Sequence, residues 1–181
     1  MPLSIAPLQH HQIDSLVRLL TELHGHYNDP PTASADEVRE HLLQNLLPQA
    51  GLTLLVAADE RDEVQGLAAL VLLHSLVEPG LAGRRQCLLK ELYVRNTARD
   101  VAIGRQLMQA SAAFALQSGC GRLDWNVKAT NAPGLRFYER LGGRRVDDRL
   151  SYRLSTDALA ALSAEGHAAG AAAPIAAGGP R

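Results

Sequence analysis

The chain has 181 residues, a formal net charge of −1 and two cysteines, Cys87 and Cys120. This length suits one domain with a sizeable core, and the balanced charge excludes a general electrostatic footprint for nucleic acid. The distant cysteines exclude a disulfide framework or a metal quartet, and no apolar run approaches the roughly 20 residues that cross a bilayer. Without a leader-like start, we expect an unprocessed cytoplasmic protein with no metal, nucleic-acid or membrane partner.

The first half of the chain predicts an edge strand, two helices and a hairpin. Apolar residues recur at helical spacing from Ile13 to Leu23. Ser34 and Glu37 have the spacing of a capping box, which opens a second helix. Two apolar, partly β-branched runs with a polar segment between them are typical of antiparallel neighbours. The expected bounds are 3–8 for the edge strand, 36–47 for the second helix, and 53–58 and 66–76 for the hairpin.

The second half predicts strands that alternate with helices. Gly119 and Gly121 mark the end of one helix, and Gly142 and Gly143 mark the end of the next. The order of elements indicates an α/β chain with a mixed sheet covered by helices. The expected bounds are strand 86–94, helix 104–117, strand 122–127, helix 132–141 and one or two closing strands over 144–154.

The composition changes after residue 154. A short helix is expected over 156–164, and 166–181 is almost entirely Ala, Gly and Pro. Such a segment has too few bulky apolar groups to offset the entropy of ordering it. We therefore expect a folded domain over 1–154 and a short helix with a mobile tail over 155–181.

The most informative segment lies where the strand ending at Val94 leads to the helix that begins near Ile103. The first amide N–H groups of a helix have no intrahelical partner, and the helix dipole adds partial positive charge at the same end. This end of the helix can therefore hold a pyrophosphate without a lysine.

Two motifs in this region resemble those of the GNAT family of N-acetyltransferases, closest to its diamine and polyamine branch. Residues 99–104, R-D-V-A-I-G, are similar to the family's Q/R-x-x-G-x-G/A segment, and 131–142 are similar to its N-x-x-x-x-x-F-Y-x-x-x-G segment. The resemblance covers about residues 3–154. It implies a mostly antiparallel twisted sheet with a V-shaped splay, flanked by helices. It also implies direct acetyl transfer from acetyl-CoA to a primary amine of a diamine, polyamine, amino acid or related small molecule.

The resemblance also implies a set of residues that bind acetyl-CoA. Ala102 stands where the family has glycine, and Asp100 brings negative charge near two phosphates, so weaker binding is expected. Arg99 and Arg105 could offset Asp100, or be solvated charges at the helix end. The implied set is Leu92, Tyr93, Val94, Arg99, Asp100, Val101, Ala102, Ile103, Gly104, Arg105, Asn131 and Tyr138.

Acetyl transfer needs a base, because an alkylammonium of pKa about 10.4 is mostly charged at neutral pH. The resemblance implies Glu91 for this role, although Lys90 replaces an acidic residue of the polyamine branch. Alternatively, Glu91 is an outward strand residue paired with an arginine. Further candidates cluster where the first helix breaks: Glu22, His24, His26 and Asp29.

Tyr138 matches the family's tyrosine that protonates the leaving thiolate, and a phenol of pKa near 10 can donate that proton. Alternatively, Tyr138 is an aromatic residue that packs on the inner face of its helix. Trp125 is either core or a wall of the acceptor pocket, and His26 and Tyr27 are expected to contact the acceptor.

Two other functions stay open at this point. One is acetylation of a protein N-terminus or lysine, and the other is a non-catalytic acyl-CoA sensor. A homodimer is expected because the sheet leaves edges that a second subunit could cover.

Overall fold

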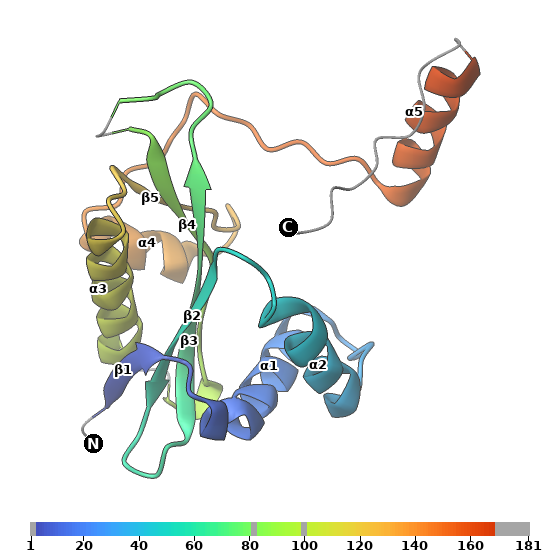
Figure 1. Ribbon diagram of the computed structural model, residues 1–181. Coiled ribbons are helices and arrows are strands. Elements are labelled where there is room, and N and C mark those ends of the chain that lie inside the picture. The colour runs from blue at the N-terminus through green and yellow to red at the C-terminus, as the bar shows by residue number, and fades with distance from the viewer. Residues whose placement is uncertain (1–2, 81–82, 99–100, 169–181) are drawn as a thin grey trace. The chain divides into compact units, whose positions relative to one another are not determined.

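The computed structural model describes residues 3–80, 83–98 and 101–168, and the chain divides into two compact units, Met1–Leu141 and Gly142–Arg181. The first unit is built on a five-stranded sheet of order β1-β2-β3-β4-β5 (Figure 1). The first four strands are antiparallel neighbours, and β5 lies parallel to β4. The strands are β1 (Ser4–Pro7), β2 (Leu52–Ala58), β3 (Val64–His74), β4 (Arg85–Val94) and β5 (Leu123–Trp125).

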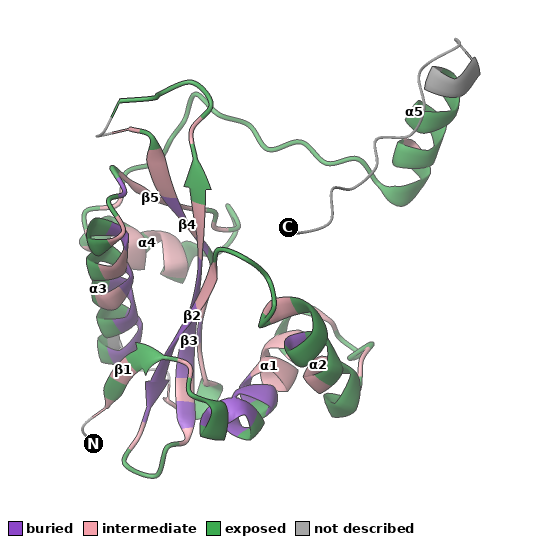
Figure 2. Ribbon diagram, viewed as in Figure 1, coloured by how far each residue is buried: buried purple, intermediate pink, exposed green. Residues whose placement is uncertain are grey.

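Helices cover both faces of this sheet (Figure 1). Because side chains alternate along a strand, Leu54 and Val56 of β2 pack on one face, while Leu55 and Ala57 pack on the other. The first face is covered by α1 (Ile13–Tyr27) and α2 (Ala35–His41). The second is covered by α3 (Val101–Gln117) and α4 (Ala132–Arg140). Figure 2 shows the buried residues concentrated in the central strands and on the sheet-facing sides of α1 and α3.

A β-bulge in β4 changes which face its side chains reach. Ala69 of β3 pairs with Glu91 and Leu70 pairs with Leu89, so Lys90 is an extra residue on β4. Before the bulge, Leu89 packs in the core beneath α3; after it, Tyr93 packs in the core beneath α1. Glu91 shares the strand phase of Tyr93 and is therefore directed toward α1.

The β4 and β5 strands part beyond the bulge. Their pairing ends at Leu89 and Trp125, whereas β4 continues to Val94. The V-shaped splay implied by the family resemblance is thus present. It also explains why β5 is shorter than the expected strand 122–127.

The expected second helix is present but ends differently. After α2, residues Leu42–Leu46 form a π-helical turn, in which the Leu47 N–H donates to the Leu42 carbonyl at 2.9 Å. Two short 3-10 turns, His10–Gln12 and Asn96–Ala98, precede α1 and α3.

The prediction of closing strands over 144–154 is wrong. Leu150 and Tyr152 alternate with polar residues as in a strand, yet they are 78% and 89% exposed. The described part of the second unit holds no other strand to pair with them, and an unpaired strand is not stable. The unit's helix, α5 (Thr156–Ala168), is longer than the expected 156–164. The rest of the expected tail, 169–181, lies outside the described residues.

Candidate active site

Glu91 lies on β4 at the start of the splay and faces the C-terminal end of α1. The Tyr27 hydroxyl donates a hydrogen bond to its Oε1 at 3.2 Å. Burial raises the pKa of the Glu91 carboxyl above its usual range, while the Tyr27 bond and the charges of His26 and Lys90 oppose that rise. Glu91 is therefore a half-buried carboxylate bonded to a tyrosine rather than to an arginine. A raised pKa makes it a stronger base than an exposed carboxylate.

Tyr138 approaches the same place from α4. Its ring centroid lies 5.2 Å from that of Trp125 at the end of β5. Burial raises the pKa of the Tyr138 phenol, and the nearby negative charge of Glu91 and the phenol of Tyr27 add to this rise. The phenol thus stays protonated at neutral pH and remains able to donate a proton.

The local sequence fixes the start of α4. Asn131 is the N-cap, and its side-chain oxygen accepts a bond from the Gly134 N–H at 3.0 Å. Pro133 lies in the first turn, where its missing N–H costs nothing. This cap sets the start of the helix that carries Phe137 and Tyr138.

Two further side chains, His26 and Lys128, lie near Tyr27. The His26 ring lies 5.3 Å from that of Tyr27 and 5.9 Å from that of Tyr93. The Nζ of Lys128 lies 5.0 Å from the centroid of the Tyr27 ring. Lys128 belongs to no motif in the sequence. It lies three residues before Asn131, and that spacing has no chemical meaning by itself.

Glu22, a candidate base from the sequence, connects α1 to the loop after β4. Its Oε1 accepts bonds from the Asn96 N–H at 2.7 Å and from the Tyr93 hydroxyl at 3.0 Å. Its Oε2 lies 3.9 Å from Nη1 of Arg95. The carboxylate thereby holds the loop that leads to α3.

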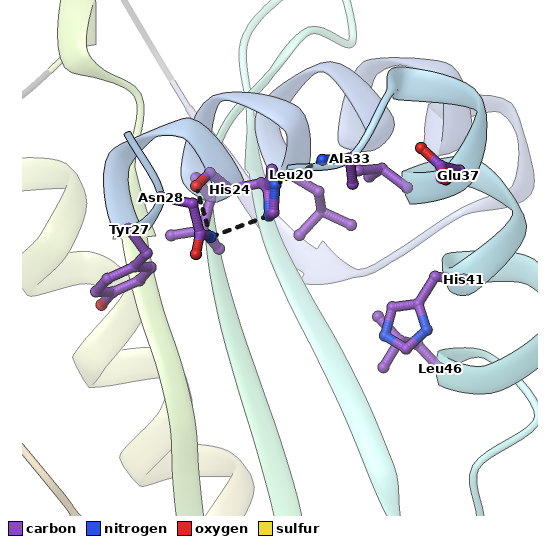
Figure 3. Close-up of a pocket in the computed structure, with 10 residues that line it drawn as sticks. Leu20, His24, Tyr27, Asn28, Ala33, Glu37, His41 and Leu46 are labelled. Atoms are coloured by element: carbon purple, nitrogen blue, oxygen red, sulfur yellow. Dashed lines mark hydrogen bonds between the residues drawn. The ribbon is translucent and has the colours of Figure 1, made fainter. Parts of the chain in front are cut away.

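His24, another candidate, fastens the loop between α1 and α2. Its Nε2 accepts bonds from the backbone N–H groups of Thr32 and Ala33, both at 3.1 Å. It also lines a mostly apolar pocket of about 320 Å³ between the two helices, which Tyr27 borders (Figure 3). His24 is therefore directed toward this loop. Asp29 is exposed beyond the end of α1.

The described part of the expected acetyl-CoA site includes a stretch of β4 that does not pair with β5. Beyond Leu89, β4 has no β5 residue opposite it, and α3 starts across this gap. A Cβ added at Gly104 would lie 3.4 Å from Phe137 Cζ and 4.0 Å from Val94 Cγ2, so the start of α3 lies close to α4 and β4. Leu92 and Val94 pack toward α3, whereas Tyr93 faces away from it.

Ala102 is helical and does not have a positive φ, so alanine in place of the family's glycine carries no strain from a left-handed backbone. Ile103 is a core residue, so only its backbone can serve a ligand, and Arg105 is exposed. Arg99, Asp100 and the side chain of Val101 lie outside the described residues.

Among the described residues, no group of three or more His, Cys, Asp or Glu side chains could hold a metal ion. No helix in that part of the chain combines the length and apolar character needed to cross a membrane.

A sequence model of the Acetyltransferase (GNAT) family matches residues 16–143. The chain belongs to this family, and the match includes every residue of the site described above.

Individual relatives agree with this assignment. Over 84 residues the chain is 29% identical to L-ornithine N5-acetyltransferase of Arabidopsis thaliana. This aligned segment covers 46% of this chain and 37% of that protein. The chain is 35% identical over 66 residues to mycothiol acetyltransferase of Corynebacterium jeikeium strain K411, covering 35% and 19%. The chain thus spans well under half the length of these two relatives. An integron cassette protein from the mobile metagenome of V. cholerae has a similar structure, with a TM-score of 0.80, 28% identity, and coverage of 90% and 98%.

Proposed function

We propose that this protein transfers an acetyl group from acetyl-CoA directly to a primary amine of a small molecule. The observation that carries the proposal is the convergence of Glu91 and Tyr138 at the splay, from β4 and α4. One is a half-buried carboxylate with a raised pKa and the other a protonated phenol. Family membership and the two named acetyltransferases support the same reaction.

The two groups have complementary roles in this proposal. Glu91, directly or through a water molecule, takes the proton that the acceptor ammonium must lose before its nitrogen can form a bond to the acetyl carbon. Tyr138 gives its proton to the sulfur as the carbon–sulfur bond breaks. As the amide forms, the nitrogen loses a second proton. One of the two protons taken from the nitrogen returns to Tyr138 through Glu91 and the other is released to solvent, so both groups are back in their starting state after one turnover. Holding donor and acceptor together at the splay supplies the proximity that direct transfer requires.

Acetyl-CoA would supply the activated acetyl group. In the proposal, the β4 backbone from Leu92 to Val94 binds its pantetheine amides, and the start of α3, from Arg99 to Arg105, binds its pyrophosphate. Asn131 supports the donor indirectly, because its side chain is engaged in capping α4.

The acceptor site is proposed to lie against His26, Tyr27 and Trp125. Tyr27 is 50% exposed, so a small amine can reach the wall that includes Glu91. We further propose that the catalytic domain spans 1–154, with 155–181 as an appended helix and tail, and that the protein acts as a cytoplasmic homodimer.

The test is thiol release from acetyl-CoA against a panel of diamines, amino acids, aminoglycosides and peptides, alongside calorimetric binding of acetyl-CoA. Turnover with small amines is expected. Turnover with peptides alone would favour a protein acetyltransferase. Binding without any turnover would favour an acyl-CoA sensor, and absence of binding would contradict the proposal.

A further inference from the structure

The charges around Glu91 are mainly positive. The charges that act on this carboxylate come from His26 and Lys90, and both favour its ionised form. Two acidic residues of the same region are engaged elsewhere: Glu22 with the loop after β4, and Glu37 with the capping box at Ser34. The wall of the acceptor site therefore offers little to a second ammonium group on the acceptor.

Lys128 places a further positive charge at the opening of this site. Its backbone is held in the turn before α4, where its carbonyl accepts a bond from the Asn131 N–H at 2.9 Å. Its ammonium lies over the ring of Tyr27, the residue whose hydroxyl donates to Glu91. The length of one tyrosine side chain thus separates the ammonium from the candidate base.

The Lys128 ammonium is available to an anion. The side chain is exposed, and none of the ion pairs among the described residues includes it. An ammonium has three N–H donors, so a contact with one aromatic face leaves donors for solvent or a ligand.

We infer that Lys128 binds a carboxylate of the acceptor, so that the preferred acceptors are amino acids rather than diamines or polyamines. This inference rests on the proposed function. The acceptor carboxylate meets Lys128 on the outer side of the Tyr27 ring, and the reacting amine meets Glu91 at the hydroxyl of the same tyrosine. Lys128 is therefore a specificity-determining residue for the proposed reaction.

The experiment compares acceptors that differ only in a carboxylate at the end of the molecule remote from the reacting amine: ornithine with putrescine, and lysine with cadaverine. For wild type, kcat/KM should be higher for the carboxylated member of each pair. Lys128→Met keeps an unbranched chain on the Tyr27 ring and should lower this preference about fivefold, through KM, as expected for an exposed ion pair. Lys128→Glu should reverse the preference.

The chain offers a matched control, because Lys90 is the other of its two lysines. It is exposed at the bulge beside Glu91. Lys90→Met removes a positive charge near Glu91 but not the proposed contact with the acceptor carboxylate, so it should change the preference between members of a pair less than Lys128→Met does. Tyr27→Phe keeps the ring under Lys128 but removes the bond to Glu91, so it should lower kcat without changing the preference.

Dissociation constants for the same pairs, measured by ligand-observed NMR, separate this inference from the proposed function. Tighter binding of the carboxylated member, lost in Lys128→Met, supports the inference even without turnover. Equal binding and equal kcat/KM within each pair would overturn it while leaving acetyl transfer intact. Equal effects of Lys128→Met and Lys90→Met would also overturn it. Absence of thiol release with every amine would count against the proposed function alone.

Discussion

Glu22 offers the sharpest test of how the fold supports donor binding. Its carboxylate accepts two hydrogen bonds, from the Asn96 N–H and the Tyr93 hydroxyl, and its side chain is 24% exposed. A hydrogen bond to a charged group contributes about 1.5 to 3 kcal/mol, and partial exposure favours the low end of that range. Glu22→Ala should therefore lower the free energy of unfolding by about 2 to 3 kcal/mol.

The same substitution should weaken donor binding, because Asn96 belongs to the loop between β4 and α3. Loosening this loop frees the start of α3, so the KM for acetyl-CoA should rise about fivefold, equivalent to about 1 kcal/mol, while the acceptor KM changes little. Glu22→Gln retains an acceptor oxygen for both bonds and should lose about 1 kcal/mol of stability or less. Urea denaturation and steady-state kinetics measure the two effects.

Glu63 provides the control. Its carboxylate also accepts two kinds of bond, from Ser15 Oγ at 2.9 Å and Arg18 Nη2 at 2.6 Å, both on α1. It lies just before β3, where the charge of Arg95 acts on it, but its hydrogen bonds among the described residues go to α1 and not to the backbone of the donor loop. Glu63→Ala should lower stability without changing the KM for acetyl-CoA. If Glu22→Ala raises that KM no more than Glu63→Ala does, the proposed link between Glu22 and donor binding is refuted.

Four other predictions concern the catalytic pair and its support. Tyr138→Phe should lower kcat at least about 100-fold, since general acid catalysis contributes a rate enhancement of about 10² to 10⁴. The dissociation constant of acetyl-CoA, measured by calorimetry, should stay near normal. Full activity of this variant would remove Tyr138 from the mechanism. For Glu91, kcat/KM should fall as the pH drops through its raised pKa, and Glu91→Gln should abolish this limb of the profile. The folded state favours the protonated Glu91 carboxyl, so ionisation of Glu91 lowers the stability of the protein above the usual carboxyl pKa. In thermal unfolding, Glu91→Gln should therefore be more stable than the wild type at neutral pH. Near pH 3 the two proteins should be equally stable. Asn131→Ala removes the cap of α4 and should cost about 1 kcal/mol in urea denaturation, whereas an unchanged midpoint would contradict the role of the cap.

Much of the fold could be predicted because its signals are local. Helical spacing from Ile13 and the capping box at Ser34 depend on a few neighbouring residues, and both elements are present. The strand pattern at Leu150 and Tyr152 was misleading, because alternation indicates a strand only where a partner strand exists.

The candidate site was predictable in its residues more than in its arrangement. Family motifs pointed to Glu91 and Tyr138, yet the direction of Glu91 depends on the bulge at Lys90, which arises from pairing with β3. The position of Lys128 over Tyr27 joins residues from the segment after β5 and the end of α1, and no sequence pattern relates them. Glu22 looked like a base because of its charge, whereas its bonds to Asn96 and Tyr93 became visible only in three dimensions.

The most direct test of the central claim is mass spectrometry of the acceptor after incubation with acetyl-CoA, for wild type and for a protein carrying both Glu91→Gln and Tyr138→Phe. The wild type should produce an N-acetylated amine in a one-to-one ratio with free thiol. The double variant should bind acetyl-CoA and form almost no product. Equal product from the two proteins would contradict the assignment of the chemistry to this pair, and thiol release without an acetylated amine would contradict transfer to an amine.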